Sequence, residues 1–503
     1  MLDAITVSNY RGFKAATALE LKPITVLLGR NSSGKSSLTR LVPLIQQSLE
    51  RQSSSPVLWA SDAVDLGTIK DVINHDAGSE PLTIGFRISG VSLETPSQRR
   101  RGYWRSRDDI NYNIDYEIRL KAEGIRTRFE GLSISINDQC VKLDWNESGV
   151  VSSIKVNDVE FAIASEYVVL MTSIFPDIIN IADVDDRLIR GRGALFYPPL
   201  REALSEFFHK RTSEQKIEYW INRFPFTSRE EIHDVVQQIP NVVLRRVENK
   251  EQIAFLSDCS LLNDLPDIIR YIGSHINAII GASAYIGPSR ASGNRFDRIQ
   301  ELAVNRIDAS GINTAMYLYS LDADEMRNFN DLLMSACGHM VEMEESGHGH
   351  VSIKVGRFGQ GHFENVSDVG FGFSQIIPVV AQLHAVQNNE YSRVKLHSTQ
   401  VIFAVEQPEL HLHPAMQANL ADLFAKAAGS SSRQATTMLI ETHSETMIAR
   451  LGLLVAEGEL DPDDVAVYFV EKDEVSGISN LTKATYNTDG IIDVWPVGFF
   501  SSI

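Results

Sequence analysis

The chain has 503 residues and a formal net charge of −18, with 43% apolar and 22% charged residues. This composition is typical of a globular protein with about three domains, or with one large core that carries inserted subdomains. The acidic balance argues against a surface that coats nucleic acid everywhere. It is compatible with a local basic groove, because phosphate contacts act within about a Debye length.

The cysteines and the hydropathy pattern indicate the cellular setting. Cys140, Cys259 and Cys337 are far apart and form no C-x-x-C pair, so neither a zinc site nor a disulfide framework is expected. The chain begins without a basic segment followed by an apolar core, and no run approaches the roughly 18 apolar residues of a membrane span. We therefore expect a soluble, cytoplasmic protein that has no membrane partner.

The first predicted elements are a buried strand, a glycine-rich loop and a helix. Residues 24–28 are apolar and partly β-branched, and residues 29–36 fit the pattern G-x-x-x-x-G-K-[ST] at every fixed position. A helical pattern follows over 36–45, in which Pro43 predicts a kink. The alternative, a glycine turn with an incidental lysine, does not account for this strand–loop–helix context.

The chemistry of this loop predicts a nucleotide-binding site. Its backbone N–H groups and the following helix N-terminus favour phosphate, Lys35 reaches the β- and γ-phosphates, and the Ser36 hydroxyl is a ligand for Mg²⁺. The predicted nucleotide-binding residues of the loop are Gly29, Arg30, Asn31, Ser32, Ser33, Gly34, Lys35, Ser36 and Ser37.

The middle of the chain changes its period twice. Apolar and polar residues alternate over 110–120, which predicts a half-buried antiparallel strand within a sheet that covers about 80–163. From about 164 to 280 the pattern is helical, with capping-box spacing at Ser228 and Glu231 and a helix that opens at Leu265 and Pro266. We expect five stretches: residues 1–80 and 281–470 as two parts of one domain, 81–163 as a β insertion, 164–280 as a helical insertion, and 471–503 as a tail.

Two buried strands near the C-terminus end in polar groups. Residues 401–405 end at Glu406, followed by Gln407 and Glu409, and residues 437–440 end just before Glu441 and His443. A helix over 415–428 joins them, so this is a parallel α/β unit whose ligands lie at the carboxyl edge of the sheet. Glu406 is where a P-loop ATPase places its second Mg²⁺-directed group.

A glycine-rich segment, residues 369–375, opens another helix. Alone, Gly370 and Gly372 indicate a tight turn more often than a phosphate cradle. Because the segment lies between a P-loop and a carboxylate strand, it also becomes a candidate for contacting nucleotide that is held by another subunit.

With these motifs in view, the chain resembles the ABC-type ATPase heads of the RecF, SMC and OLD group, especially the bacterial AAA-family ATPases of anti-phage defence loci. The resemblance covers residues 9–13, the P-loop, 285–290, 369–375, 406–414, 442–444 and 495–500, whereas about 90–280 matches only as a variable insertion. It implies an α/β fold: a split P-loop ABC-ATPase head with an inserted antiparallel β subdomain and a helical insertion. It also implies ATP sites between two subunits, with Gly370, Gly372, Ser374 and Gln375 acting in trans and Arg11 near the nucleotide.

One position departs from that resemblance. ABC heads usually carry Asp then Glu at the end of the 401–405 strand, whereas this chain has Glu406 then Gln407. Because glutamine cannot accept a proton, either Glu409 substitutes as the base or hydrolysis is slow and the protein acts mainly as an ATP-gated clamp. His443 is expected to orient the γ-phosphate or the attacking water.

We expect an ATP-binding and ATP-hydrolysing switch, at least a homodimer, that gates a separate effector such as a nuclease or toxin in anti-phage defence or DNA maintenance. No nuclease carboxylate set is evident, and the stretch after His443 is too short for a Toprim domain. The alternatives are an assembly scaffold with negligible hydrolysis and, less favoured, a transporter ATPase subunit. Residues 99–107 interleave arginines with aromatics, which indicates either DNA or RNA contact or a solvated loop.

Overall fold

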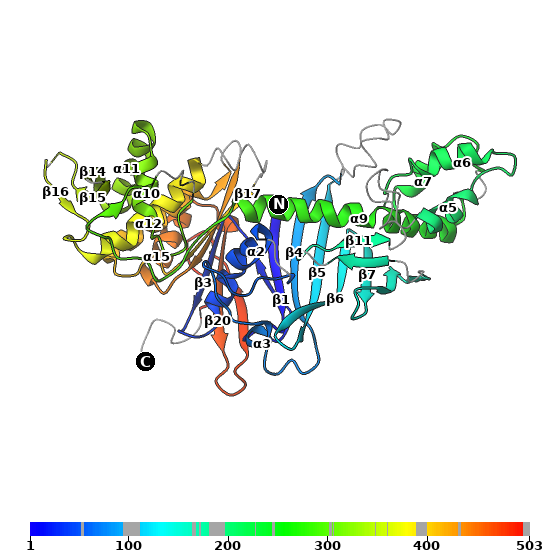
Figure 1. Ribbon diagram of the computed structural model, residues 1–503, viewed down its shortest axis with the longest axis horizontal. Helices are drawn as coiled ribbons and strands as arrows, with labels where there is room; N and C mark the ends of the chain where they lie inside the picture. The colour runs from blue at the N-terminus through cyan, green and yellow to red at the C-terminus, as the bar shows by residue number, and fades with distance from the viewer. Residues whose placement is uncertain are drawn as a thin grey trace. The chain divides into compact units, whose positions relative to one another are not determined.

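The computed structural model describes most of the chain as two compact units (Figure 1). The described residues are 1–51, 55–93, 111–162, 167–170, 173–180, 197–226, 228–243, 247–300, 304, 306–347, 349–359, 361–388, 400–430 and 434–495. The first unit consists of Met1–Thr6, Gln52–Val57 and Ser79–His275, and the second consists of Val7–Arg51, Leu58–Gly78 and Ile276–Ile503.

The second unit is built on a mostly parallel sheet with the strand order β12-β17-β19-β3-β20-β21. All neighbours in this sheet are parallel except β20 and β21, and β18 pairs antiparallel with β19. The strands are β3 (Ile24–Gly29), β12 (Ala284–Ile286), β17 (Gln400–Glu406), β18 (Gly429–Ser430), β19 (Ala435–Glu441), β20 (Val465–Lys472) and β21 (Ser479–Ala484). The N-terminal strand β3 therefore lies between β19 and β20 from the C-terminal part of the chain.

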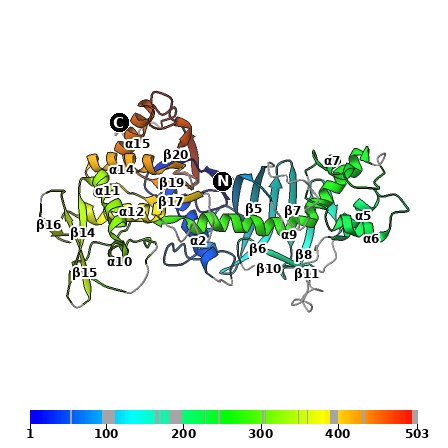
Figure 2. The ribbon, with the colours of Figure 1, turned by 90° about the horizontal axis from the view of Figure 1, so that it is seen from above.

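Helices account for the continuous burial of these strands. Every residue of β3 and of β17 is buried, the pattern of a parallel sheet covered on both faces. Figure 2 shows α12, α14 and α15 beside β17 and β19. The helices of this unit are α1 (Lys35–Thr39), α2 (Leu41–Glu50), α3 (Ile69–Val72), α10 (Thr314–Ser320), α11 (Ala323–Cys337), α12 (Phe371–Asn388), α14 (Pro414–Ala427), α15 (Glu445–Ala456) and the 3₁₀ turn η2 (Pro462–Asp464).

A small antiparallel sheet completes the second unit. Strand β15 lies between β13 and β14, and β16 also pairs with β15. The strands of this small sheet are β13 (Asp297–Arg298), β14 (Met340–Ser346), β15 (His350–Gly356) and β16 (Phe363–Asn365). Strand β2 (Thr17–Glu20) also belongs to the second unit but not to this sheet.

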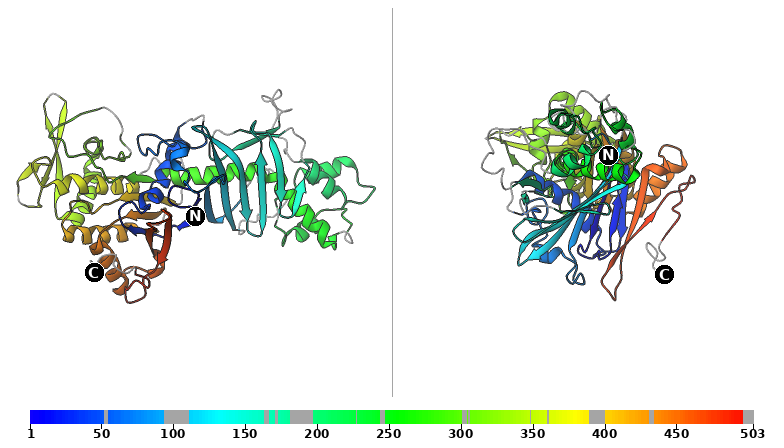
Figure 3. Two further views of the ribbon diagram at one scale, coloured as in Figure 1. Left: turned by 90° about the horizontal axis from the view of Figure 1, so that it is seen from below. Right: turned by 90° about the vertical axis from the view of Figure 1, so that its right-hand side faces the viewer.

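The first unit carries a long antiparallel sheet, whose strands lie side by side in Figure 3, in the order β1-β4-β5-β6-β7-β8-β9. In β5 the predicted alternation is confirmed, since Tyr112, Ile114, Tyr116 and Ile118 are buried and their neighbours are more exposed. The strands of this sheet are β1 (Leu2–Ser8), β4 (Leu82–Val91), β5 (Tyr112–Glu123), β6 (Arg126–Ile136), β7 (Gln139–Trp145), β8 (Val151–Val156) and β9 (Val159–Phe161). Two further strands, β10 (Tyr167–Leu170) and β11 (Asp177–Asn180), pair with each other in a separate antiparallel sheet. The helices are α5 (Tyr197–Ser205), α6 (Glu214–Ile221), α7 (Ile232–Gln237) and α9 (Lys250–Ala282), whose last residues belong to the second unit.

The α/β class expected from the sequence is confirmed, and the P-loop strand β3 lies in one sheet with strands from the C-terminal part, but three local expectations change. Pro266 does not open a helix. It lies inside α9, where the burial of neighbours such as Leu265 and Ile269 outweighs the roughly 3 kcal/mol that an internal proline costs. The helix after the P-loop divides at Arg40, because Pro43 has no N–H to donate to the carbonyl of Thr39. Strand β21 lies within the stretch expected as a tail, since it extends the sheet beside β20.

None of the helices in the described part of the chain is both long and apolar enough to cross a membrane. The division of the chain into five stretches stays a prediction.

The core of the second unit gives a stability prediction. Phe403 is fully buried in β17 and meets Phe424 of α14 edge-on, with ring centroids 6.2 Å apart. We expect Phe403→Ala to lower the free energy of unfolding by about 3–5 kcal/mol, because it removes apolar contact and leaves a cavity. Denaturant unfolding measures the loss. Phe358→Ala is the control, since Phe358 is 79% exposed and its removal is expected to change stability by at most about 0.5 kcal/mol.

Candidate functional site

The P-loop takes its shape from glycines at two positions. Gly34 has φ +113° at the start of α1, a left-handed conformation that side chains rarely adopt. At Gly29, a Cβ atom would collide with the carbonyl oxygen of Val470 in the neighbouring strand β20. The loop therefore turns tightly from β3 into α1, which brings its backbone N–H groups to the start of a helix, where that of Ser33 donates to the Arg30 carbonyl at 3.3 Å.

Lys35 is held inside this loop. Its side chain is only 3% exposed, and its Nζ donates to the carbonyl oxygens of Gly29 and Arg30 at 2.9 and 2.8 Å. Burial lowers the pKa of Lys35, and the nearby carboxylate of Glu441 opposes that shift more than any other acid does. The ammonium group thus lies against loop carbonyls, close to several acidic side chains.

Glu441 of β19 accepts hydrogen bonds from the P-loop helix. Ser36 Oγ donates to Glu441 Oε1 at 2.8 Å, and Thr39 Oγ1 donates to Glu441 Oε2 at 3.2 Å. Sheet register explains the contact, because β19 is the direct neighbour of β3 and Glu441 pairs with Leu27. Burial, together with the charge of Glu406, raises the pKa of Glu441 to about 7.

Glu406 of β17 is surrounded by other partners. Arg40 binds it with two hydrogen bonds, Nε to Oε1 at 2.7 Å and Nη2 to Oε2 at 2.8 Å. The hydroxyl of Tyr285 in β12 donates to Oε1 at 2.7 Å, and Arg290 donates to the backbone oxygen of Glu406 at 2.6 Å. The Glu406 carboxylate is 1% exposed and is neutralised by a bidentate arginine.

Glu409 and His443 form the third part of the cluster. The backbone N–H of His443 donates to Glu409 Oε1 at 2.7 Å. Within the described residues, Glu409 Oε2 and His443 Nε2 are buried and have no hydrogen-bond partner. Burial raises the pKa of Glu409 and lowers the pKa of His443, so burial disfavours the charged form of each.

Gln407 has a left-handed backbone, with φ +46°, and its N–H donates to the carbonyl of Glu441 at 2.7 Å. The chain therefore turns sharply at Gln407, between the two carboxylates Glu406 and Glu409. Its side chain is half-buried.

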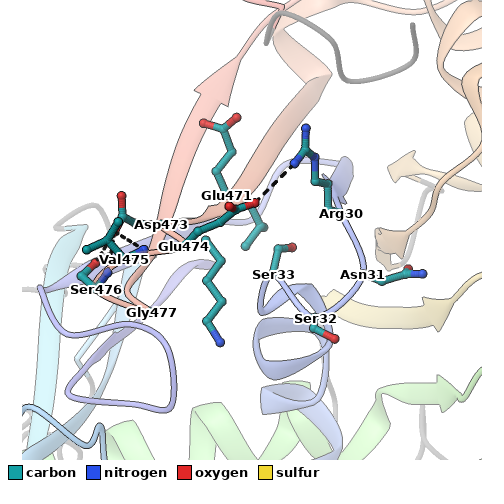
Figure 4. Close-up of a pocket in the computed structure, with 12 residues that line it drawn as sticks. Arg30, Asn31, Ser32, Ser33, Glu471, Asp473, Glu474, Val475, Ser476 and Gly477 are labelled. Carbon is teal, nitrogen blue, oxygen red and sulfur yellow. Dashed lines mark hydrogen bonds and ion pairs between the residues drawn. The ribbon is translucent and has the colours of Figure 1, made fainter. Parts of the chain in front are cut away.

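A cavity of about 610 Å³ lies beside the P-loop (Figure 4). One wall is residues 30–33 and the other is residues 470–477, at the end of β20 and the turn that follows it. Arg30 and Glu474 form a loose ion pair across it, with Nη1 and Oε1 3.9 Å apart. The buried hydroxyl of Ser33 has no partner within the described residues.

The glycine-rich segment at the start of α12 is not joined to the P-loop by any hydrogen bond found in the described part of the chain. Ser374 Oγ instead accepts from the backbone N–H of Gly293 at 3.2 Å, and a Cβ at Gly372 would lie 3.0 Å from the carbonyl oxygen of His411. Buried Nε2 of Gln375 has no partner among the described residues, Gly370 has open space around it, and Phe371 is 49% exposed.

Arg11 and Ser37 form hydrogen bonds through backbone atoms, and the partner of the Arg11 N–H lies outside the P-loop. The N–H of Arg11 donates to the carbonyl of Val72 at 2.6 Å, and the Ser37 carbonyl accepts from the Tyr10 hydroxyl at 3.0 Å. The basic segment 99–107, and residues 496–500 of the predicted ending, lie outside the described residues.

The sequence pattern does not identify several residues of the cluster as site residues. They are Thr39, Arg40, Tyr285, Arg290 and Glu441. Two signals were present. Glu441 ends a buried strand as Glu406 does, and Arg40 follows Ser36 by one helical turn.

The donors around Ser36 fit Mg²⁺ that arrives with a nucleotide. Within the described ranges, no group of three or more His, Cys, Asp or Glu side chains could hold a metal ion. Mg²⁺ in ATPase sites is commonly bound by one or two carboxylates together with substrate phosphates, so a hydroxyl and strand-end carboxylates are the oxygen ligands that it requires.

The Arg40–Glu406 pair gives a second stability prediction. Arg40→Ala leaves a buried carboxylate without its cation, and we expect a loss of about 3 kcal/mol in the free energy of unfolding. Chemical denaturation measures it. The double variant Arg40→Met with Glu406→Gln is expected to recover most of the loss, because no uncompensated charge remains. Equal destabilisation of the single and double variants would contradict this assignment.

Comparison with known proteins adds the following findings. A family model described as an AAA ATPase domain matches residues 1–139 and 260–448. No curated protein matches the chain. Similar solved structures include an SMC head bound to the C-terminal winged-helix domain of ScpA, at 11% identity and TM-score 0.38, over 96% of this chain and 97% of that one. The SMC head domain of Thermotoga maritima matches at 8% identity and TM-score 0.32, over 96% and 98%. A Pyrococcus furiosus complex, the SMC head with an extended coiled coil bound to the C-terminal domain of ScpA, matches at 11% identity and TM-score 0.36, over 96% of each chain.

Proposed function

This chain belongs to the AAA ATPase domain family, and we propose that it binds ATP with Mg²⁺ and hydrolyses it where the P-loop meets the ends of β17 and β19. The matched residues include both of these regions. The observation that carries the proposal is the contact between Ser36 and Glu441, because it joins the P-loop to the C-terminal strand ends in one cluster with Lys35 and Glu406.

Different residues of the cluster have different roles in phosphoryl transfer. The loop N–H groups and the Lys35 ammonium bind the β- and γ-phosphates, where Lys35 exchanges its carbonyl partners for phosphate oxygens. Mg²⁺, when bound, offsets the negative charge of these phosphates. Water attacks the γ-phosphorus, the bond from that phosphorus to the ADP oxygen breaks, and the proton of the water passes to a carboxylate.

We propose that Glu409 is the carboxylate that takes the proton of the attacking water. It is a carboxylate that accepts from the His443 N–H, it has one buried oxygen free of hydrogen bonds among the described residues, and Gln407 cannot perform this role. His443, whose pKa burial lowers and whose Nε2 has no hydrogen-bond partner among the described atoms, orients the water or the γ-phosphate.

We assign the nucleoside to the cavity beside the P-loop. A volume of about 610 Å³ is within the range of small-molecule sites, and the cavity opens next to the loop that binds the phosphates. Its walls supply both charged and amide groups, among them Arg30, Asn31 and Glu474, which can bind ribose hydroxyls and the edge of a base (Figure 4).

The same proposal includes ATP-dependent pairing of two copies, through which the protein gates a separate effector in anti-phage defence or DNA maintenance. Two observations at the start of α12 support it: Ser374 is hydrogen-bonded to Gly293 and not to the P-loop among the described residues, and Phe371 is 49% exposed, which leaves this segment accessible to a second copy. Light scattering with ATP on the Glu409→Gln variant tests the pairing. A doubled mass is expected, and an unchanged mass would contradict it.

Phosphate release by the wild-type protein tests the catalytic part of the proposal. We expect release in Mg²⁺ that stops when EDTA removes the metal, measured with and without DNA. Binding of ATP without any phosphate release would instead favour the assembly scaffold. The reason to consider a scaffold is that Gln407 occupies the position where a catalytic glutamate is usual.

A further inference from the structure

We propose that Glu441 is the carboxylate that holds the Mg²⁺ of the bound nucleotide. Glu406, which the sequence pattern predicts for this role, is not. The proposal rests on the proposed function, since the metal arrives with ATP. It assigns Glu406 to a structural ion pair with Arg40.

The first argument is the position of Glu441 relative to the P-loop hydroxyl. Ser36 is the residue whose hydroxyl ligates Mg²⁺ in a P-loop, and its Oγ lies 2.8 Å from Glu441 Oε1. A carboxylate oxygen at hydrogen-bond distance from one metal ligand is in reach of the same cation. No such contact with Ser36 is found for Glu406 among the described residues.

The second argument is the state of Glu406. Both of its oxygens already accept from Arg40, and Oε1 also accepts from Tyr285. A bidentate guanidinium neutralises the carboxylate and occupies the directions from which a cation would approach. Mg²⁺ would therefore have to compete there with the Arg40 guanidinium and the Tyr285 hydroxyl.

Charge compensation is the third argument. Glu441 is 3% exposed, yet its hydrogen-bond donors are the two hydroxyls of Ser36 and Thr39, and no ion pair is found for it in the described part of the chain. A buried carboxylate is normally paired with a cation or coordinates a metal. Glu406 has its cation in Arg40, and Glu441 lacks one in contact.

Sheet order is the fourth argument. Strand β19 lies between β17 and β3, so Glu441 is one strand from the P-loop strand and Glu406 is two strands away. The register is fixed at both sides, with Glu441 opposite Leu27 and opposite Glu406. The carboxylate nearest the P-loop in the sheet is therefore that of Glu441.

Nucleotide affinity measured with and without metal tests the assignment. A fluorescent ATP analogue is titrated into the wild type, Glu441→Gln and Glu406→Gln, once in Mg²⁺ and once in EDTA. We expect Mg²⁺ to tighten binding to the wild type and to Glu406→Gln. In Glu441→Gln this gain is expected to fall roughly 10- to 100-fold, while the affinity in EDTA is retained. The reverse pattern, with the gain lost only in Glu406→Gln, would overturn the assignment.

Replacing each carboxylate with a thiolate gives a second test. It measures which metal ion the nucleotide site prefers, and so does not depend on a loss of nucleotide affinity. Cd²⁺ prefers sulfur ligands, so Glu441→Cys is expected to bind the analogue more tightly in Cd²⁺ than in Mg²⁺, whereas Glu406→Cys is not. A Cd²⁺ preference confined to Glu406→Cys would overturn the assignment. If the wild type binds no nucleotide in either buffer, the proposed function itself fails; if it binds and Glu441→Gln keeps the metal gain, only this inference fails.

Discussion

Replacing Lys35 with alanine is expected to weaken ATP binding by about one to four orders of magnitude, the largest effect on nucleotide affinity that we predict. The ammonium lies inside the P-loop, 2.9 and 2.8 Å from two loop carbonyls, where it can turn to the phosphates. Removing one partner from a buried, hydrogen-bonded charge pair costs roughly 2–5 kcal/mol of binding free energy, and each 1.4 kcal/mol is about tenfold in affinity.

Isothermal titration with ATP and Mg²⁺ measures this loss. Lys354→Ala is the matched control, because Lys354 lies in β15, forms a 3.0 Å ion pair with Glu344 and has no part in the P-loop cluster. Its affinity for ATP is expected to equal that of the wild type. If Lys35→Ala binds ATP with an affinity within about twofold of the wild type, the P-loop is not the ATP-binding site that we propose.

Glu409→Gln is expected to lower the rate of ATP hydrolysis by about 10²- to 10⁴-fold, the range attributed to general acid–base groups, while ATP affinity changes little. Glutamine keeps the oxygen that accepts from the His443 N–H at 2.7 Å, so the local structure is retained. Only the proton-accepting oxygen is lost, which separates catalysis from binding.

Single-turnover phosphate release measures the chemical step for this variant. Gln407→Ala is the control, because a glutamine at that position cannot take the proton, and its rate is expected to remain within about tenfold of the wild type. A Glu409→Gln rate equal to that of the wild type would show that the base is another group. Equal rates in the wild type and Lys35→Ala would favour the scaffold alternative.

The P-loop and the two C-terminal strands could be predicted from local sequence alone. The apolar run of β3, the glycines and the start of α1 follow one another in the chain, and β17 and β19 are short, fully buried runs. Such elements are defined by neighbouring residues, so their positions could be read from the pattern.

Contacts between distant residues could not be read in the same way. The position of β19 between β17 and β3 is a property of the folded sheet, and it decides that Glu441 rather than Glu406 meets Ser36. The pairing of Arg40 with Glu406 likewise joins residues from opposite ends of the chain. The prediction that Pro266 opens a helix is wrong because the burial of α9 outweighs the local preference of proline for a helix start.

A crystal structure of the chain with Mg²⁺ and a non-hydrolysable ATP analogue shows whether the two distant parts of the chain form one site for triphosphate and metal. We predict that the γ-phosphate lies within hydrogen-bond distance of Lys35 from the N-terminal part, with Glu441, Glu409 and His443 from the C-terminal part around the same phosphate and metal. A nucleotide bound away from residues 29–37, or one whose phosphates and metal meet no residue of 400–444, would contradict it.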